Sequence, residues 1–167
     1  MPVLPIGFRG KPFTIIIFPS VPSILDTRAT SSLITSSVSE IGNNSFDHNL
    51  GSWPDTPGIF FAYDIHKKNI VLADRGLGIL TTLKRVKSNL NTDEEALRVA
   101  FTEIISGRAP ESRGNGLKFV RKIVSENSVG LIFRTGNAEL ILPKDSSEIN
   151  IRSSTEPFRG CLAFITF

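Results

Sequence analysis

Three short groups of polar and glycine residues in this sequence have the side chains that bind or transform a charged ligand. In the first, Glu40, Asn44 and His48 follow one another at four-residue spacing. Residues at that spacing lie on one face of a helix. A carboxylate beside an amide oxygen can orient a water molecule and complete the coordination shell of a magnesium ion. The same pattern is also typical of a solvated helix face, so that alternative stays open.

The second group is Asp74, Gly76 and Gly78, directly after a strand-like run and before a helical pattern. An aspartate at the end of a strand offers a carboxylate acceptor, and glycines at alternate positions let the backbone approach a ligand closely. The alternative is a tight strand-to-helix turn, for which glycine is the usual residue.

The third group, at the start of another helical pattern, consists of Arg113, Gly114, Asn115, Gly116 and Leu117. The first turn of a helix has free backbone amides and the positive end of the helix dipole, which favour an anion. A plain loop with glycine hinges explains the two glycines equally well.

The strands that must position these groups follow from apolar or alternating runs. Such runs predict strands at 13–18, 59–65, 69–74, 129–133, 138–142 and 161–167. A polar turn at 66–68 joins two of them into a hairpin. Gly136 and Asn137 predict a turn between 129–133 and 138–142.

Helices follow from the spacing of apolar residues. That spacing predicts one helix over about 23–48 and another over 117–124, with a further helical pattern at Ile79, Leu83 and Val86.

Between these helices, Thr92 and Glu95 form a capping-box pattern ahead of a helix through Ile104, which Gly107 would stop. Small and polar residues at 106–115 predict a mobile loop. The elements together predict an α+β two-layer sandwich, with a mixed, largely antiparallel sheet and helices on one face.

Composition favours one globular domain in the cytoplasm. The chain has 167 residues, of which 40% are hydrophobic and 21% charged, and this argues against disorder and fibrous folds. No apolar run approaches the roughly 18 residues that cross a bilayer, and residues 1–10 lack the pattern of a secretory signal. The single Cys161 excludes an internal disulfide and a cysteine-based zinc site. The net charge of +3 is scattered among acids, which gives little support for nucleic-acid binding.

The order of the three groups resembles the histidine-kinase-like ATPase superfamily. That superfamily includes sensor histidine kinases, DNA gyrase, heat-shock chaperones, mismatch-repair proteins and anti-sigma-factor serine kinases. The shared pattern is Glu-x-x-x-Asn on a helix, Asp-x-Gly-x-Gly after a strand, a long lid, Gly-x-Gly at a helix start and a final strand led by glycine. The layout is most similar to that of the free-standing anti-sigma-factor kinases.

The resemblance covers about 13–167 and leaves 1–12 as an N-terminal extension. It implies the Bergerat ATP-binding fold, with ATP and Mg²⁺ as ligands and a lid at about 79–113. Glu40 would be the catalytic base that orients the attacking water or hydroxyl, and Asn44 the magnesium ligand. Asp74 would accept the adenine amino group.

The resemblance also implies roles for the glycines. Gly76 and Gly78 would let the backbone lie against the adenine base. Gly114 and Gly116 would bend the lid and present amides to the phosphates. The cofactor-binding set that the resemblance implies around them also includes Arg113, Asn115 and Leu117.

The sequence departs from the family pattern at three places. Cys161, after Gly160, stands where relatives have a threonine whose hydroxyl helps to bind near the adenine. Asp47 stands where many histidine kinases have a basic residue that reaches phosphate, so that contact is either absent or supplied by His48, Arg108, Arg113 or Lys118. Lys118 replaces a third glycine and could meet phosphate at the helix N-terminus, although a solvated lysine is the commoner case.

The resemblance implies an ATPase or ATP-dependent protein kinase in signalling or regulation. The alternative is a non-catalytic interaction module whose lid orders over ATP and changes the surface offered to a partner. A third interpretation is a degenerate relative without nucleotide binding, against which the intact Asp74, Asn44 and glycine pairs argue. The implied partners are a regulatory protein and a second copy of the chain, with neither nucleic acid nor membrane.

Overall fold

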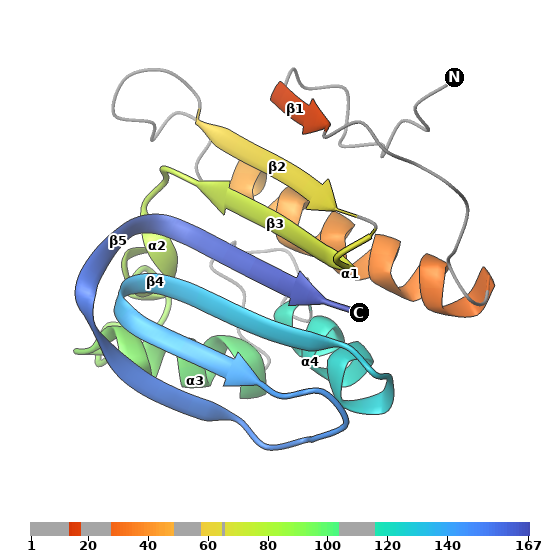
Figure 1. The fold of residues 1–167 in the computed structure, drawn as a ribbon. Coiled ribbons are helices and arrows are strands. Elements are labelled where there is room, and N and C mark those ends of the chain that lie inside the picture. Colours follow the sequence, from red (N-terminus) through yellow and green to blue (C-terminus); the bar gives the residue numbers. More distant parts are fainter. Residues whose placement is uncertain (1–13, 18–27, 49–57, 65, 104–115) are drawn as a thin grey trace.

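The computed structural model describes residues 14–17, 28–48, 58–64, 66–103 and 116–167. These residues form one sheet and four helices (Figure 1). The strands are β1 (Thr14–Ile17), β2 (Ile59–Asp64), β3 (Asn69–Asp74), β4 (Gly130–Leu142) and β5 (Asn150–Thr166). The helices are α1 (Arg28–Asp47), α2 (Gly78–Leu83), α3 (Asp93–Thr102) and α4 (Gly116–Glu126).

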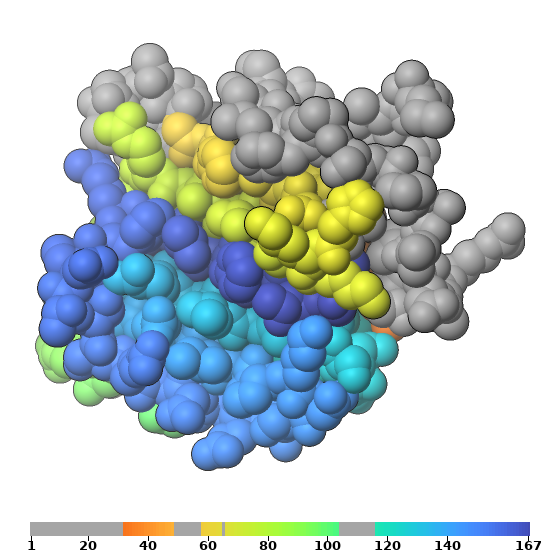
Figure 2. Space-filling model, in the orientation of Figure 1, coloured from red at the N-terminus to blue at the C-terminus, as the bar shows by residue number. Residues whose placement is uncertain are grey.

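The sheet has the order β1-β2-β3-β5-β4. Strand β1 pairs with β2 in parallel, and every other neighbouring pair is antiparallel. The four helices lie together behind the sheet in Figure 1, and Figure 2 shows the opposite face, where β3, β5 and β4 lie side by side. The expected α+β architecture, with a mixed, largely antiparallel sheet and helices on one face, is therefore confirmed.

The core lies between the helices and the sheet. On β3, buried side chains alternate with half-buried ones, as expected for a strand with one covered face. The helices contribute apolar side chains at three-to-five-residue spacing, which places them on one side of each helix. The buried residues of α1 and α4 in this core are Ile34, Val38, Ile41, Phe46, Leu117, Val120 and Val124. Each such side chain stabilises the fold by about 1.5–3 kcal/mol.

Several predicted elements are confirmed at their expected places. Strands β2 and β3 form the hairpin, with Ile59 opposite Asp74. Helix α4 begins at Gly116, and α1 ends at Asp47, close to the expected end near His48. The predicted start of α1, at 23–27, lies outside the described residues. The described helices are too short or too polar to form a bilayer-spanning segment.

The capping box of α3 is confirmed, but the predicted ends of α2 and α3 are wrong. The Thr92 hydroxyl accepts from the Glu95 amide at 3.1 Å, and the Glu95 carboxylate accepts from the Thr92 amide. Glu103 is already extended, so α3 ends before Gly107. Helix α2 ends at Leu83, and Val86 of the predicted helical pattern is exposed.

The predicted turn at Gly136 and Asn137 is also wrong, because β4 continues through it. The register with β5 shifts on both sides of Gly136, whose φ is +53°, as in a β-bulge. The Asp93 carboxylate of α3 accepts from the Asn137 amide at 2.9 Å and occupies the space that a side chain at residue 136 would need. The contact with α3 and the positive φ both favour glycine here. A glycine followed by asparagine is also typical of a hairpin turn, which is why the sequence predicted one.

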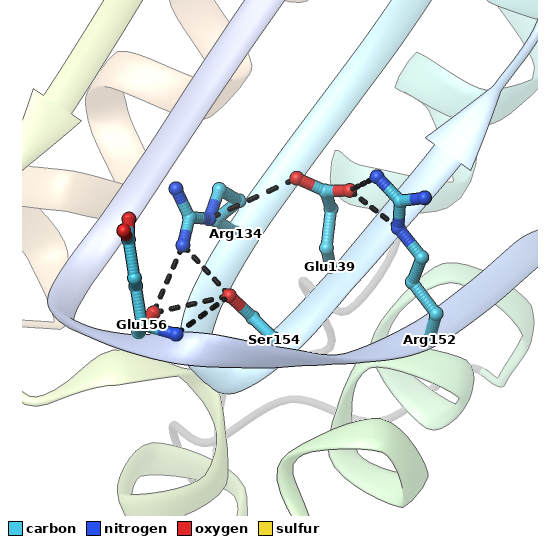
Figure 3. A network of polar contacts seen from close by, with 5 residues as sticks. All are labelled: Arg134, Glu139, Arg152, Ser154 and Glu156. Atoms are coloured by element: carbon cyan, nitrogen blue, oxygen red, sulfur yellow. Dashed lines mark hydrogen bonds and ion pairs between the residues drawn. The ribbon is translucent and has the colours of Figure 1, made fainter.

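On both sides of the bulge, a polar network joins β4 to β5 (Figure 3). Arg134 Nη2 donates to Ser154 Oγ at 2.8 Å and to the Glu156 carbonyl at 2.9 Å. Glu139 accepts from Arg152 Nε at 2.8 Å and lies 3.8 Å from Arg134 Nε. Strand β5 therefore begins at Asn150, well before the predicted strand at 161–167. Its first half is polar and lacks alternating apolar residues, so the sequence pattern did not indicate a strand there.

Candidate functional site

The first sequence group meets the third at the contact between α1 and α4. A Cβ built on Gly116 would lie 2.8 Å from Glu40 Oε2 and 3.5 Å from Asn44 Nδ2. The backbone at the start of α4 therefore lies directly against the polar face of α1, and a larger residue at position 116 would require the end of the Glu40 side chain to move. Glu40 and Asn44 are both half-buried. A carboxylate and an amide thus lie beside a helix N-terminus, where backbone amides favour anions.

The second group is built around the buried carboxylate of Asp74, the last residue of β3. Asp74 is only 3% exposed. Its Oδ2 accepts from Ser45 Oγ at 2.9 Å, and its Oδ1 accepts from the Gly76 amide at 2.8 Å. The hydrogen bonds hold the carboxylate in one orientation and compensate for its burial.

Ser45 connects the first group to the second, and the sequence analysis missed it. It follows Asn44 on α1, so the helix presents Asn44 to α4 and Ser45 to the end of β3. A signal was present in the sequence. Ile34, Val38 and Ile41 form the buried stripe of α1, and Ser45 is the buried polar residue that continues it at helical spacing.

Gly78 and Gly160 close the other side of Asp74. Gly78 has φ +76°, and a Cβ there would lie 2.9 Å from Thr135 Oγ1. Gly160 has φ +84°, and a Cβ there would overlap the backbone and carboxylate oxygens of Asp74. Both positions require glycine for backbone conformation and for space inside the protein.

Cys161 follows Gly160 and is half-buried, with its Sγ 3.8 Å from Thr135 Oγ1. Burial, followed by the negative charge of Asp74, raises the pKa of the Cys161 thiol well above its ordinary value. The thiol is therefore neutral at physiological pH.

Lys118 stands in the first turn of α4, two residues after Gly116. Its Nζ is shielded from solvent and has no hydrogen-bond partner among the described residues, although the side chain as a whole is half-buried. Burial lowers the pKa of Lys118. A shielded, unpaired ammonium group is unfavourable until an anion compensates for its charge.

The remaining residues of the predicted set divide into two groups. Leu117 is buried in the core and supports α4 from inside. Arg113, Gly114 and Asn115 lie outside the described residues.

Asp47 and His48 close α1, where the His48 amide donates to the Asn44 carbonyl at 3.1 Å. Within the parts of the chain that the structure describes, no three His, Cys, Asp or Glu side chains gather into a metal-binding group.

No protein-family model matches the chain, and no curated protein matches it. Among solved structures, the chain is similar to the ATPase region of topoisomerase II from Saccharomyces cerevisiae bound to ICRF-187 (dexrazoxane), at 15% identity and a TM-score of 0.48. A second structure of the same region gives 14% identity and a TM-score of 0.47. Both alignments cover 78% of this chain and 36% of the other chain, so this chain spans about a third of their length.

The hydrogen bond from Ser45 to Asp74 is testable by substitution. Ser45→Ala is expected to lower the free energy of unfolding by about 1.5–3 kcal/mol, because it removes a donor from a buried carboxylate. Ser36→Ala is the matched control, since Ser36 is exposed on the same helix and its hydroxyl bonds to the Ser32 carbonyl. Any gain in helix propensity is common to both variants. Urea denaturation measures the difference, and equal effects in the two variants would contradict the assignment.

Proposed function

We propose that this chain binds ATP with Mg²⁺ at the site formed by Glu40, Asn44, Asp74 and the start of α4. On this proposal it hydrolyses ATP or transfers its terminal phosphoryl group to a protein. The main support is the close approach of Gly116 to Glu40 and Asn44, which puts an anion-binding helix N-terminus beside a carboxylate and an amide. This contact joins two of the motifs that resemble the histidine-kinase-like ATPases.

Asp74 is proposed to recognise the adenine base. Its carboxylate is an acceptor held in place by Ser45 and the Gly76 amide. The adenine amino group is a donor, and it would form a charge-assisted hydrogen bond with this acceptor. Guanine has a carbonyl oxygen at the corresponding ring position, so two acceptors would face each other without a proton between them. A buried site of this kind rejects the mismatched base strongly.

The phosphates are proposed to lie at the start of α4. The amides of the first helical turn and the ammonium group of Lys118 would compensate for their charge. The shielded, unpaired Nζ of Lys118 fits such an anion and supports the proposal. Lys118 would then replace the basic residue that many histidine kinases have at the position of Asp47.

The donor set also fits magnesium. Mg²⁺ is usually held by one or two protein oxygens together with phosphate oxygens and water, so the Asn44 amide oxygen is a sufficient contribution from α1. When bound, the ion would neutralise charge on the phosphates as the bond to the leaving group breaks. Glu40, near the same helix end, would orient the attacking water or hydroxyl and take its proton.

A non-catalytic module that responds to ATP is the second candidate, because ligand binding and the role of Glu40 are separable. Both candidates require the ATP site, and only the first requires Glu40 as a base. We also propose that the chain acts with a regulatory protein, which would accept the phosphoryl group or be bound by the chain. A second copy of the chain is a further proposed partner.

Asp74→Asn is expected to weaken ATP binding. The loss of one hydrogen bond to a charged acceptor corresponds to about 1.5–3 kcal/mol, or roughly tenfold to a hundredfold in Kd. Asp64→Asn is the control, because Asp64 ends the neighbouring strand and contacts Lys67 at the surface. Calorimetric titration with Mg-ATP measures both, and thermal melting verifies that each variant is folded. Unchanged affinity in folded Asp74→Asn would refute the assignment of the base site.

Glu40→Gln is expected to reduce ATP turnover by at least about a hundredfold, the usual contribution of a general base, while Kd for ATP changes little. Glu126→Gln is the control, since Glu126 is exposed on α4 and pairs with Lys122 at the surface. Phosphate release and calorimetric titration separate turnover from binding. Equal turnover in Glu40→Gln would remove its catalytic role, and ATP binding without turnover in the wild type would favour the interaction module.

Lys118→Met is expected to weaken ATP binding by about tenfold and to leave adenosine binding unchanged, because only ATP has the phosphates. Lys122→Met, on the exposed side of the same helix, is the control. Wild-type affinity should also fall as the pH rises through the lowered pKa of Lys118, since the uncharged amine must regain a proton to pair with phosphate. A pH series of titrations in which Lys118→Met behaves like the wild type would contradict this role.

A further inference from the structure

Thr135 is a fully buried polar residue in the middle of β4 that none of the sequence motifs includes. It lies opposite Cys161 in the register with β5, directly before the bulge at Gly136. Its hydroxyl donates to the Gly160 carbonyl at 2.8 Å and accepts from the Ile79 amide at 3.1 Å. One hydroxyl thus joins β4, β5 and the start of α2.

The bond to Ile79 has a local cause. The first amides of a helix have no partner within the helix, and side-chain caps usually satisfy one of them. The residue before α2, Leu77, makes no such side-chain cap bond. Thr135 therefore supplies from another strand the acceptor that a serine or aspartate cap would supply locally.

Both partners of Thr135 belong to segments that contact Asp74. Ile79 follows the Asp-x-Gly-x-Gly turn, whose Gly76 amide donates to Asp74 Oδ1. Gly160 packs so closely on Asp74 that a Cβ would overlap its oxygens. The Thr135 hydroxyl consequently ties together the two backbone segments between which the carboxylate is held, and it does so without solvent access of its own.

We propose that Thr135 is a positioning residue that determines adenine specificity by holding the 76–79 turn and Gly160 around the Asp74 carboxylate. This inference rests on the proposed function, because it assigns base recognition to Asp74. Thr135 does not touch the ligand. Without its hydroxyl, the Ile79 amide and the Gly160 carbonyl lose their shared partner, and the turn is free to move relative to β5.

The test compares Thr135→Val, which keeps the shape and removes the hydroxyl, with Thr135→Ser, which keeps the hydroxyl. Calorimetric titration of the full chain with Mg-ATP and with Mg-GTP gives the ratio of the two Kd values. We expect Thr135→Val to reduce this adenine preference by about tenfold, and Thr135→Ser to retain it within about twofold. Rescue by serine separates a hydrogen-bonding role from one of simple packing.

Thr82→Val is the matched control. Thr82 is also buried, but its hydroxyl bonds within α2 to the Gly78 carbonyl at 2.8 Å. The variant should lose some stability without a change in adenine preference. An unchanged preference in folded Thr135→Val would overturn the inference and leave the proposed function intact, whereas a wild-type chain that does not bind ATP would overturn both.

If Thr135→Val does not fold, hydrogen exchange on the wild type decides the question. The Ile79 amide is expected to exchange at least about tenfold more slowly with Mg-ATP than with saturating Mg-GTP, because only adenine stabilises the arrangement around Asp74. Equal protection by the two nucleotides would overturn the inference.

Discussion

The burial of the Asp74 carboxylate is the constraint on which the arrangement of the candidate site depends. A carboxyl group that is only 3% exposed must be hydrogen-bonded, because a buried polar or charged group without compensation is strongly destabilising. Ser45 is one donor to this carboxyl group, and its bond fixes how α1 lies on the sheet. The Gly76 amide also donates to it, and this bond fixes how the chain turns after β3. The close packing of Gly160 excludes any larger residue above the carboxylate.

Helix α1 links Asp74 to the rest of the site, because it contacts both β3 and α4. Because Ser45 must face Asp74, the preceding Asn44 and the earlier Glu40 are turned toward α4. The start of α4 then approaches these side chains at Gly116, where a Cβ would lie 2.8 Å from Glu40 Oε2. The proposed base-binding and phosphate-binding parts are thus two sides of one helix, and a small rotation of α1 would disturb both.

The sequence predicts most clearly what short-range physics determines. The β2–β3 hairpin, the capping box of Thr92 and Glu95, and the start of α4 depend on residues within a few positions of one another. Ser45 and Thr135 escaped detection because their partners are distant: 29 residues separate Ser45 from Asp74, and 56 separate Ile79 from Thr135. The Gly136 bulge imitates a turn because its cause, Asp93 on α3, lies 44 residues before Asn137. Local pattern therefore located the candidate motifs, whereas the contacts that orient them required the fold.

The same packing bears on how the protein could respond to a nucleotide. The predicted lid at about 79–113 contains α3, in which Leu97 and Phe101 have no solvent exposure and Phe101 stacks edge-on against Phe133 of β4 at 5.4 Å between ring centroids. Releasing α3 would expose these side chains at a cost of about 1.5–3 kcal/mol each, before the smaller residues are counted. A ligand shifts an equilibrium only by its difference in affinity for the two states, so ATP would need a preference of several kcal/mol to detach this helix. On the proposed function, we therefore expect α3 to stay packed against β4, the strand that carries Thr135, when a nucleotide binds.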